Sequence, residues 1–532
     1  MDIRRAALAV AVLAALAAFA PAASAADPTG PIAEDEAIEI AKADANAREA
    51  AREHPDLHPS ASRAESDRDW EVGFFAAGDQ LVQVVVDDTS GEVEESWTGH
   101  QVAWKMARGY EGAFGRALNA PYVWLPLCAI FLVGLFDWRR PLRIAHLDLI
   151  VLVAGFGVSH YFFNRGEIGL SVPLAYPALI YLMARMLWLA FRGGEGLRPR
   201  IPMPALAVAL IFLVGVRIGL NVGDSNVIDV GYSGVIGADK IADGEPLYGE
   251  FPADNSHGDT YGPIAYYAYV PFEQALKWSG DWDGLPAAHA AAIFFDLGTI
   301  ALLFLLGRRL RAGRAGTELG VLLAFAWTAC PYTTFALESN TNDSLVAMLM
   351  VATLLVITSP PARGAMLALA TMTKFAPIAL APLFATYDTA LARVTGPPRR
   401  AMSVIGLFSA AFVVTTLGVL AQTLIDPGLS EFWEKTIGNQ AGRDSPFSVW
   451  GQDPSLDWLH TAVKAVAAAL ALVVAFVPKR RDLVTVAALG AAVLLSVQLT
   501  VEHWFYLYIP WFLPFALVAL LARDPRPATT PG

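Results

Sequence analysis

The stretch PALAVALIFLVGVRIGLNV, residues 204–222, decides the fold class, because it is apolar throughout except for Arg217 and Asn221. A helix of about 20 apolar residues is long enough to cross the roughly 30 Å hydrocarbon core of a bilayer. Comparable runs recur along the chain, at residues 121–137, 147–163, 168–191, 286–306, 317–336, 343–359, 401–422, 458–477, 483–500 and 504–522. The sequence therefore predicts an all-α polytopic membrane protein with about 11 full spans.

The composition of the 532-residue chain agrees with this fold class, since 55% of its residues are hydrophobic and 17% are charged. A large soluble α/β enzyme would instead show short apolar strands and amphipathic helices. The net charge of −12 comes largely from acidic residues in segments 34–95, 224–283 and 426–457, and a nucleic-acid-binding protein would need a basic patch. Cys128 and Cys330 both fall in predicted spans, so we interpret them as small core residues and expect no disulfide.

The N-terminus has the three parts of a secretory signal peptide. Arg4 and Arg5 precede an apolar stretch at residues 6–20, and Ala23-Ser24-Ala25 offers a small-residue cleavage site. We therefore predict a signal peptide at residues 1–25, with an uncleaved anchor helix as the alternative. Both interpretations place the following segment outside the cytoplasm.

Residues 27–118 form a polar module that we expect to be a small α+β extracytoplasmic domain. Residues 34–53 have helical spacing, and a linker with Pro55 and Pro59 follows. Residues 70–74 and 81–86 read as strands, and residues 87–91 make the turn before 92–97. The order of the helix and strands, with the run W.V.F…V.VD..TG.V, resembles a PepSY domain. The resemblance implies binding or regulation; a small structural cap is the alternative.

Clusters of basic residues predict which loops face the cytoplasm, where Lys and Arg are in excess. If the chain starts outside, all the basic clusters lie on the same side of the membrane. They are at residues 139–143, 192–200, 308–314, 393–400, 479–481 and 523–526. The same assignment gives additional transmembrane helices at 119–203, a cytoplasmic tail at 523–532, and long outer loops at 223–285 and 423–457. Long ordered loops are usually functional.

Segment 363–390 does not fit a simple alternation of spans. Arg363 and the pair Arg399 and Arg400 bracket it and both favour the cytoplasmic side, while Lys374 lies between two apolar stretches of about a dozen residues. We therefore predict a re-entrant pair of short helices with Lys374 at its tip, which is tolerated where protein or a water-filled cavity covers the backbone. A single long span is the alternative.

The outer loop after span 204–222 carries an ordered set of motifs. Asp229-Val230-Gly231-Tyr232 comes first, and Glu245-Pro246-Leu247-Tyr248-Gly249 and Gly258-Asp259-Thr260-Tyr261-Gly262-Pro263 follow. This order resembles the first outer loop of the GT-C glycosyltransferases, most closely family 87. Segments 338–343 and 438–451 also resemble that family, so the resemblance covers residues 204–522. Tyr261-Gly262-Pro263 departs from the Tyr-Pro-Pro often found in relatives, which loosens the alignment there.

The resemblance implies transfer of a mannose-like hexose from a polyprenyl-phosphate donor to an extracytoplasmic lipid or polysaccharide acceptor. In an inverting transfer, one carboxylate deprotonates the attacking hydroxyl while the phosphate leaves through an oxocarbenium-like transition state. The resemblance assigns the base role to Asp229. Asp224 is the rival base, and simple capping of a loop helix by Asp229 is the structural alternative.

A departing phosphate needs a cation, and Lys374 and Arg443 are the candidates. A lysine between apolar stretches is costly unless it serves a function, although snorkelling to the interface is the alternative. Arg443 has Asp444 as an alternative partner, and Arg217 is a further cavity candidate. The other expected substrate-binding residues are Asp224, Tyr232, Tyr248, Asp259, Tyr261, Asn342, Asp343, Gln440 and His503. For His503, an interfacial histidine beside an aromatic belt is the alternative.

We assign no metal ligands and no resident cofactor from the sequence, although Asp259 and His257 allow a divalent cation. Two other functions stay open. A transporter or lipid flippase would place charged or broken-helix sites near the middle of the membrane, whereas the candidate acids lie in outer loops. A non-catalytic sensor would read an outside ligand with residues 27–118, and it leaves the long outer loops unexplained.

Overall fold

The computed structural model describes residues 31–63, 69–109, 116–194, 196–389, 398–439, 445–479 and 481–523. The predicted signal peptide, Gln440, Arg443 and most of the predicted tail lie outside these ranges. The chain divides into two compact units, Met1–Arg108 and Gly109–Gly532, and each is described by itself.

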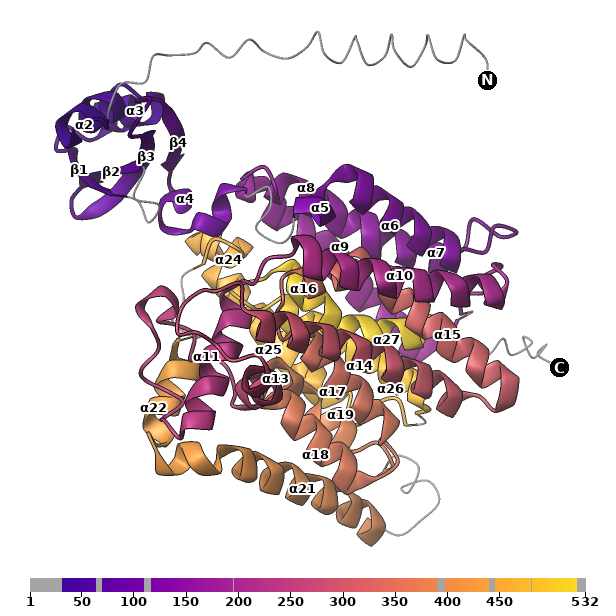
Figure 1. Cartoon of the computed structure of the whole chain (residues 1–532). Helices are drawn as coiled ribbons and strands as arrows, with labels where there is room; N and C mark the ends of the chain where they lie inside the picture. The colour runs from indigo at the N-terminus through magenta and orange to yellow at the C-terminus, as the bar shows by residue number, and fades with distance from the viewer. Residues whose placement is uncertain are drawn as a thin grey trace, which may run out of the picture. The chain divides into compact units, whose positions relative to one another are not determined.

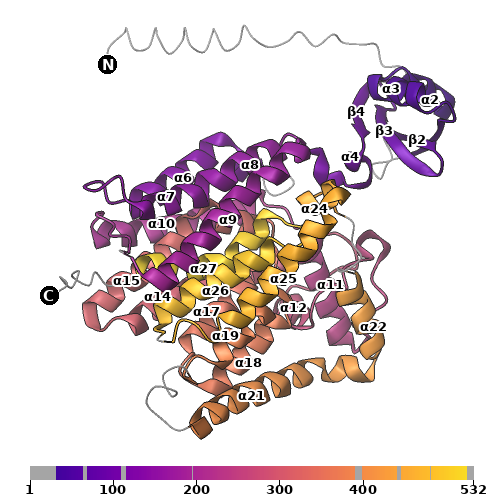
Figure 2. The same cartoon turned by 180° about the vertical axis from the view of Figure 1, so that it is seen from behind.

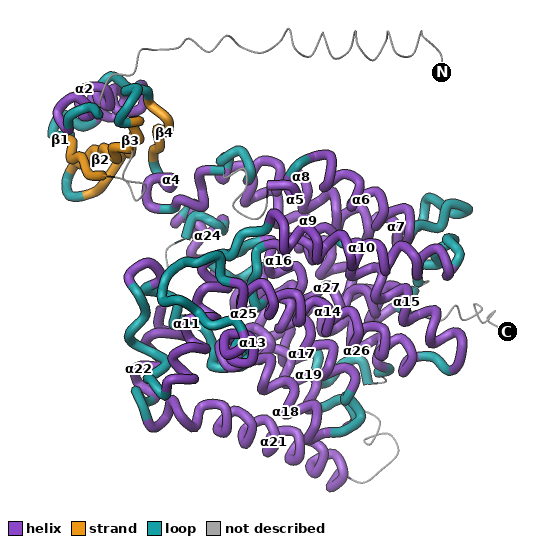
Figure 3. Tube along the Cα trace, in the orientation of Figure 1, coloured by secondary structure: helices purple, strands orange, loops and turns teal. Residues whose placement is uncertain are grey.

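The first unit is a pair of helices on a four-stranded antiparallel sheet with the strand order β1-β2-β3-β4 (Figure 3). Val72 and Val84 pack against Ala37 and Ala41 to form its core. Its elements are α2 (Glu34–Lys42), α3 (Ala45–Glu53), β1 (His58–Arg63), β2 (Asp69–Ala76), β3 (Asp79–Asp87), β4 (Val93–Thr98), α4 (His100–Ala103) and η1 (Lys105–Arg108).

Two local features of this unit differ from the sequence prediction. The helix expected at residues 34–53 breaks in two, because the Asp44 side chain accepts hydrogen bonds from the backbone N–H groups of Asn46 and Ala47 and so caps α3. The expected linker around Pro59 instead forms β1 at the edge of the sheet, a position where proline is tolerated. The PepSY-like assignment stays a prediction.

The second unit is helical. Its first half contains α5 (Arg116–Asn119), α6 (Pro121–Leu135), α7 (Ile144–Ile150), the π-helix η2 (Val151–Gly155), α8 (Phe156–Phe163), α9 (Ile168–Arg192), α10 (Met203–Asp224), α11 (Asp229–Asp243), η3 (Ala253–Asn255), α12 (Ile264–Tyr267), α13 (Val270–Ala275) and α14 (Pro286–Leu310). Its second half contains α15 (Gly313–Ala329), α16 (Pro331–Glu338), α17 (Asp343–Leu355), α18 (Pro360–Thr371), η4 (Ala376–Leu380), α19 (Ala381–Ala385), α21 (Pro398–Ile425), α22 (Leu429–Trp433), η5 (Glu434–Gly438), α24 (Val449–Gln452), η6 (Pro454–Leu456), α25 (Asp457–Val473), α26 (Leu483–Gln498), η7 (Tyr506–Tyr508) and α27 (Ile509–Leu521).

Six helices among the described residues are long and apolar enough to cross a membrane, or up to seven if a bent pair counts as one span. The bent pair is α15 and α16, which meet at 60° around Cys330 and Pro331. The apolar helices support a multi-pass membrane protein. The expected count of about 11 full spans is not confirmed, since α6, α17, α26 and the helical segments 376–385 and 506–521 are shorter.

The interior of the second unit positions the candidate site. Helix α27 is buried along its whole length and lies among α15, α17 and α26 (Figures 1 and 2). Helix α21 lies along α18 at one edge. Between α18 and η4 the helical backbone is interrupted where the tip of a re-entrant pair was expected, and Lys374 lies in this break.

Candidate functional site

Four segments that are far apart in the sequence meet at the candidate site. The start of α11 is joined to the turn at residues 338–343, because the Ile228 amide donates to the Ser339 carbonyl at 3.3 Å. The outer loop is joined to the break after α18, because the Ile264 amide donates to the Met372 carbonyl at 3.0 Å. Gly262 permits this contact, since a Cβ atom there would collide with the Met372 carbonyl.

The centre of the site is a buried ion pair between Lys374 and Asp343. The Lys374 Nζ lies 2.7 Å from Asp343 Oδ1, and the Trp511 indole N–H donates to the same oxygen at 2.8 Å. The Lys374 ammonium also faces three aromatic rings, with centroids at 5.4 Å for Tyr261, 5.7 Å for Tyr508 and 5.4 Å for Trp511. Lys374 is therefore held inside the protein, which differs from the alternative that it snorkels to the interface.

Several polar atoms beside this pair are buried and have no hydrogen-bond partner. They are Asp343 Oδ2, both amide atoms of Asn342, the Ser344 hydroxyl and the Tyr269 hydroxyl. Leaving a buried polar group unpaired costs about 1–3 kcal/mol, and most buried polar groups in native proteins have a partner. The turn that begins α17 thus holds unused donors and acceptors next to a cation.

The outer loop holds Tyr261 against this cluster. The Tyr248 hydroxyl donates to the Tyr261 carbonyl at 2.9 Å. Burial raises the pKa of Tyr248 well above its ordinary value, and the nearby Asp259 carboxylate adds to the effect, so the phenol keeps its proton. Asp259 is buried, accepts from the Gly249 amide at 2.9 Å and lies 3.7 Å from Lys435 Nζ. Asp259 therefore braces the loop.

Among the described residues, Asp259 does not belong to a group of three or more close His, Cys, Asp or Glu side chains. The one group of three close carboxylates found among these residues is Asp69, Asp87 and Glu94, in the first unit. Exposed acidic groups of this kind are common without an ion. The divalent cation that Asp259 and His257 allow stays a hypothesis, with solvation of the loop as the alternative role of both residues.

Asp229 is the first residue of α11, and its side chain is exposed. Its backbone carbonyl accepts from the Ser233 hydroxyl at 2.6 Å and from the Asn255 amide at 3.1 Å, which fixes the start of the helix. A carboxylate in the first turn of a helix is stabilised by the helix dipole. This position is compatible with a base that an acceptor can reach. It is equally compatible with an acid that only stabilises the start of the helix.

The other expected residues engage different partners. Asp224, at the end of α10, accepts from the Ala117 amide at 2.5 Å. Tyr232 is buried and donates to Asp254 at 3.0 Å, so it braces the loop. His503 is half-buried, and its Nδ1 lies 2.9 Å from the Ser445 hydroxyl.

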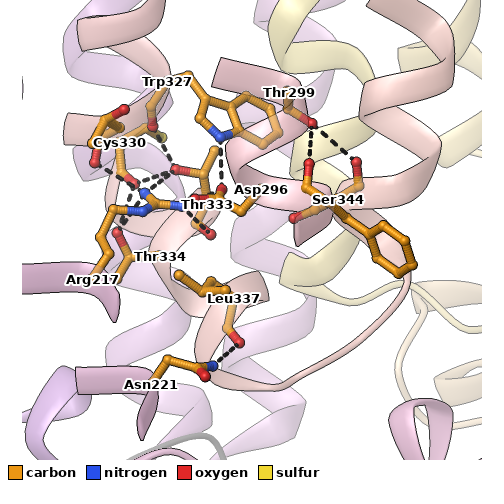
Figure 4. Close-up of polar contacts among 12 residues, drawn as sticks. Arg217, Asn221, Asp296, Thr299, Trp327, Cys330, Thr333, Thr334, Leu337 and Ser344 are labelled. Atoms are coloured by element: carbon orange, nitrogen blue, oxygen red, sulfur yellow. Dashed lines mark hydrogen bonds and ion pairs between the residues drawn. The ribbon is translucent and has the colours of Figure 1, made fainter. Parts of the chain in front are cut away.

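Arg217 is enclosed in a polar network and differs from the expected cavity-lining residue (Figure 4). Its Nη2 lies 2.5 Å from Asp296 Oδ1, and the Trp327 indole N–H donates to that oxygen at 2.8 Å. Its Nη1 donates to the hydroxyls of Thr333 and Thr334, each at 2.9 Å. The network joins α10 and α14 to the bend between α15 and α16.

Sequence reasoning missed Trp511, Tyr508 and Asp296. A lone acid within predicted span 286–306 was a signal that Arg217 has a buried partner, because unpaired charges in spans are costly. The aromatic residues after His503 were a weaker signal, since aromatic belts at membrane interfaces have the same composition.

The region that resembles a known protein family lies in the second unit. Residues 260–501 match the model of glycosyltransferase family 87. The matched region contains Tyr261, Asn342, Asp343 and Lys374, whereas Asp229 precedes it. Together with the apolar helices, the match supports a membrane glycosyltransferase. It is shorter than the resemblance expected over residues 204–522.

One solved structure that the comparison returns is ArnT from Cupriavidus metallidurans, in a crystal structure bound to undecaprenyl phosphate. The two chains are 17% identical with a TM-score of 0.41, over 60% of this chain and 59% of that chain. No curated protein gives a significant match.

Proposed function

We propose that the protein transfers a glycosyl group from a polyprenyl-phosphate donor to a hydroxylated acceptor, with the site facing the extracytoplasmic side. The observation that carries the proposal is the family 87 match over residues 260–501, which contains the buried Lys374–Asp343 pair and Tyr261. The donor sugar is a mannose-like hexose and the acceptor an extracytoplasmic lipid or polysaccharide. Both follow from the family resemblance of the outer-loop motifs.

Asp229 is the proposed base of an inverting reaction. Its carboxylate takes the proton of the acceptor hydroxyl, the hydroxyl oxygen forms the new bond to the anomeric carbon, and the bond to the phosphate oxygen breaks with its electron pair staying on the phosphate. The exposed side chain at the start of α11 supports this role, because an acceptor must reach the base.

Lys374 is the proposed cation for the departing phosphate. An ammonium has three N–H donors, and its bond to Asp343 uses one of them. The remaining donors suit phosphate oxygens, and preorganised positive charge stabilises the developing negative charge. Asn342 and Asp343 have unused polar atoms beside Lys374 that suit the hydroxyls of the sugar.

Other expected roles extend this proposal. Tyr261 faces the ammonium of Lys374, and Tyr248, Asp259 and Tyr232 brace the loop that carries it. Additional contacts to the donor are proposed for Gln440, Arg443 and a divalent cation. His503, which contacts Ser445, is proposed as a further contact. The first unit is proposed to have a binding or regulatory role rather than a catalytic one, as the PepSY resemblance implies.

Transfer from labelled polyprenyl-phosphate mannose by the purified protein tests the proposal. We expect Asp229→Asn to lower transfer by about 10²–10⁴-fold, the usual contribution of a general base. Asp224→Asn is the matched control, because it removes the rival carboxylate at the end of the preceding helix.

Full transfer by a folded Asp229→Asn protein would overturn the base assignment, and loss of transfer only in Asp224→Asn would move that role to Asp224. If the wild type transferred no sugar from any polyprenyl phosphate, the glycosyltransferase proposal would fail. A transporter or a sensor would then explain the protein better.

A further inference from the structure

The segment that leads into Asp229 is tied to the turn between α16 and α17 through the side chain of Asn340. Its Nδ2 donates to the Ser225 hydroxyl at 2.9 Å and to the Asn226 carbonyl at 3.1 Å. Its Oδ1 accepts from Asn221 Nδ2 at 2.8 Å. Asn340 is wholly buried, and its bond to Asn221 is buried with it. One side chain thereby joins the end of α10 to the loop before α11.

Backbone contacts to the two residues before Asn340 repeat this connection. The Asn226 amide donates to the Glu338 carbonyl at 3.2 Å, as the Ile228 amide does to Ser339. Gly231, in the first turn of α11, lies so close to the turn that a Cβ atom there would collide with the Asn340 carbonyl. The first turn of α11, which begins with Asp229, is therefore seated directly on the turn.

The partners of Asn340 are themselves fixed. Asn221 Nδ2 also donates to the Leu337 carbonyl at 2.8 Å (Figure 4), and Asn221 Oδ1 lies 3.1 Å from His289 Nδ1. The backbone of Asn340 has φ = 54°, the left-handed region that asparagine and glycine adopt more readily than other residues. Its side-chain type thus suits both the backbone and the hydrogen bonds.

A second asparagine in the same turn shows the opposite arrangement. Asn342 is equally buried, but both of its amide atoms lack a partner, whereas both amide atoms of Asn340 are hydrogen-bonded. The turn therefore uses Asn340 to hold the neighbouring segment and leaves Asn342 unpaired beside the Lys374–Asp343 pair.

We infer that Asn340 is a positioning residue that fixes the start of α11, and with it Asp229, relative to the Lys374–Asp343 pair. The inference rests on the proposed function, because it requires Asp229 to act in the reaction. Asn340 touches no reacting atom in this scheme. Its effect passes through the loop at residues 225–228.

Two variants of Asn340 separate its hydrogen bonds from its backbone conformation. Asn340→Gly keeps the left-handed backbone and removes all side-chain bonds, and Asn340→Asp keeps an acceptor for Asn221 but loses the donor to Ser225. We expect kcat to fall about tenfold or more with the KM for the donor unchanged, since misplacement of a reacting group lowers the rate without weakening binding elsewhere.

Gly231→Ala disturbs the same contact without a substitution at residue 340. Its new methyl group would push α11 away from the Asn340 carbonyl, and we expect the same selective fall in kcat. Gly223→Ala is the matched control, because a Cβ atom at Gly223, near the end of α10, meets nothing within 4 Å. If both glycine variants had the same kcat, the contact between α11 and the turn would not matter for catalysis and the inference would be overturned.

The double variant with Asn340→Gly and Asp229→Asn distinguishes a positioning role from a purely structural one. If Asn340 acts through Asp229, then Asn340→Gly lowers kcat in the wild type but adds nothing in the Asp229→Asn background. Rates are normalised to folded protein, and Asn340→Asp replaces Asn340→Gly if the latter does not fold.

The outcomes separate the two claims. Multiplying effects in the double variant would show that Asn340 acts independently of Asp229, which would overturn the inference and leave the proposed function intact. Unchanged transfer by Asp229→Asn would instead remove the base assignment on which the inference rests.

Discussion

Two buried ion pairs in the helical unit share the same basic design. In each pair a cation and a tryptophan indole donate to a single carboxylate oxygen: Arg217 and Trp327 to Asp296, and Lys374 and Trp511 to Asp343. All four charged side chains are almost completely buried. The pairs differ in what surrounds the cation.

The two terminal nitrogens of Arg217 are surrounded by protein acceptors, since Thr328, Thr333 and Thr334 take further hydrogen bonds from Nη1, whereas its Nε has no partner. Lys374 instead faces aromatic rings, and Asp343 Oδ2 has no partner. A buried charge needs partners to offset its desolvation. Under the proposed function, the Arg217 pair is structural and the Lys374 pair receives the phosphate of the donor.

The largest expected effect is a loss of transfer activity when the Lys374–Asp343 pair is removed. Lys374→Met combined with Asp343→Asn removes both charges together, so no buried charge is left unpaired. We expect transfer per folded molecule to fall about 10²–10³-fold, because the phosphate loses its preorganised cation. The measurement is transfer from labelled polyprenyl-phosphate mannose. A rate close to that of the wild type would mean that the two pairs do not differ in function.

The next effect is on stability. Arg217→Met leaves Asp296 buried without its cation, and we expect a loss of about 3–5 kcal/mol in the free energy of unfolding. Thermal unfolding in detergent, followed by tryptophan fluorescence, measures this change. An unchanged midpoint would show that Asp296 finds another partner and that the network is not structural.

Removing both charges of the structural pair should have a smaller effect. We expect Arg217→Met with Asp296→Asn to recover most of the stability lost in Arg217→Met, since replacing a whole buried pair is often close to neutral. Transfer per folded molecule should stay near the wild-type rate. A loss as large as that of the Lys374 double variant would contradict the structural role.

The smallest effects concern the two tryptophans. Trp511→Phe and Trp327→Phe each keep a large ring but remove one hydrogen bond to a buried carboxylate, which costs roughly 1–3 kcal/mol. We expect both to lower the unfolding midpoint, but only Trp511→Phe to slow transfer, by about tenfold at most. Equal transfer rates in the two variants would remove this distinction.

The sequence predicted the positions of the helices better than their lengths. Long apolar runs mark helices because their composition is local, and the interruption around Lys374 was visible from the flanking charges. The bend at Cys330 and Pro331 and the short helices at the site depend on packing between distant segments, so the expected count of about 11 full spans is not confirmed. The cap at Asp44 was a local signal that the single-helix prediction overlooked.

The candidate site was predicted as a set of residues but not as an arrangement. Asp343 and Lys374 were both expected to contact substrate, yet nothing in the sequence pairs residues 31 positions apart. Trp511 lies 168 positions from Asp343, so its hydrogen bond appears only once α27 packs against α17. Asn340 likewise gains its role from Asn221 and Ser225, more than 100 positions earlier.

The most direct test of the central claim is the binding of a polyprenyl phosphate to the full chain in detergent, with no acceptor present. We expect the wild type and the Arg217→Met/Asp296→Asn protein to bind with equal affinity. The Lys374→Met/Asp343→Asn protein should bind at least about tenfold more weakly, as the loss of a charge-assisted hydrogen bond predicts. Equal affinity in all three proteins would contradict the claim that Lys374 receives the phosphate.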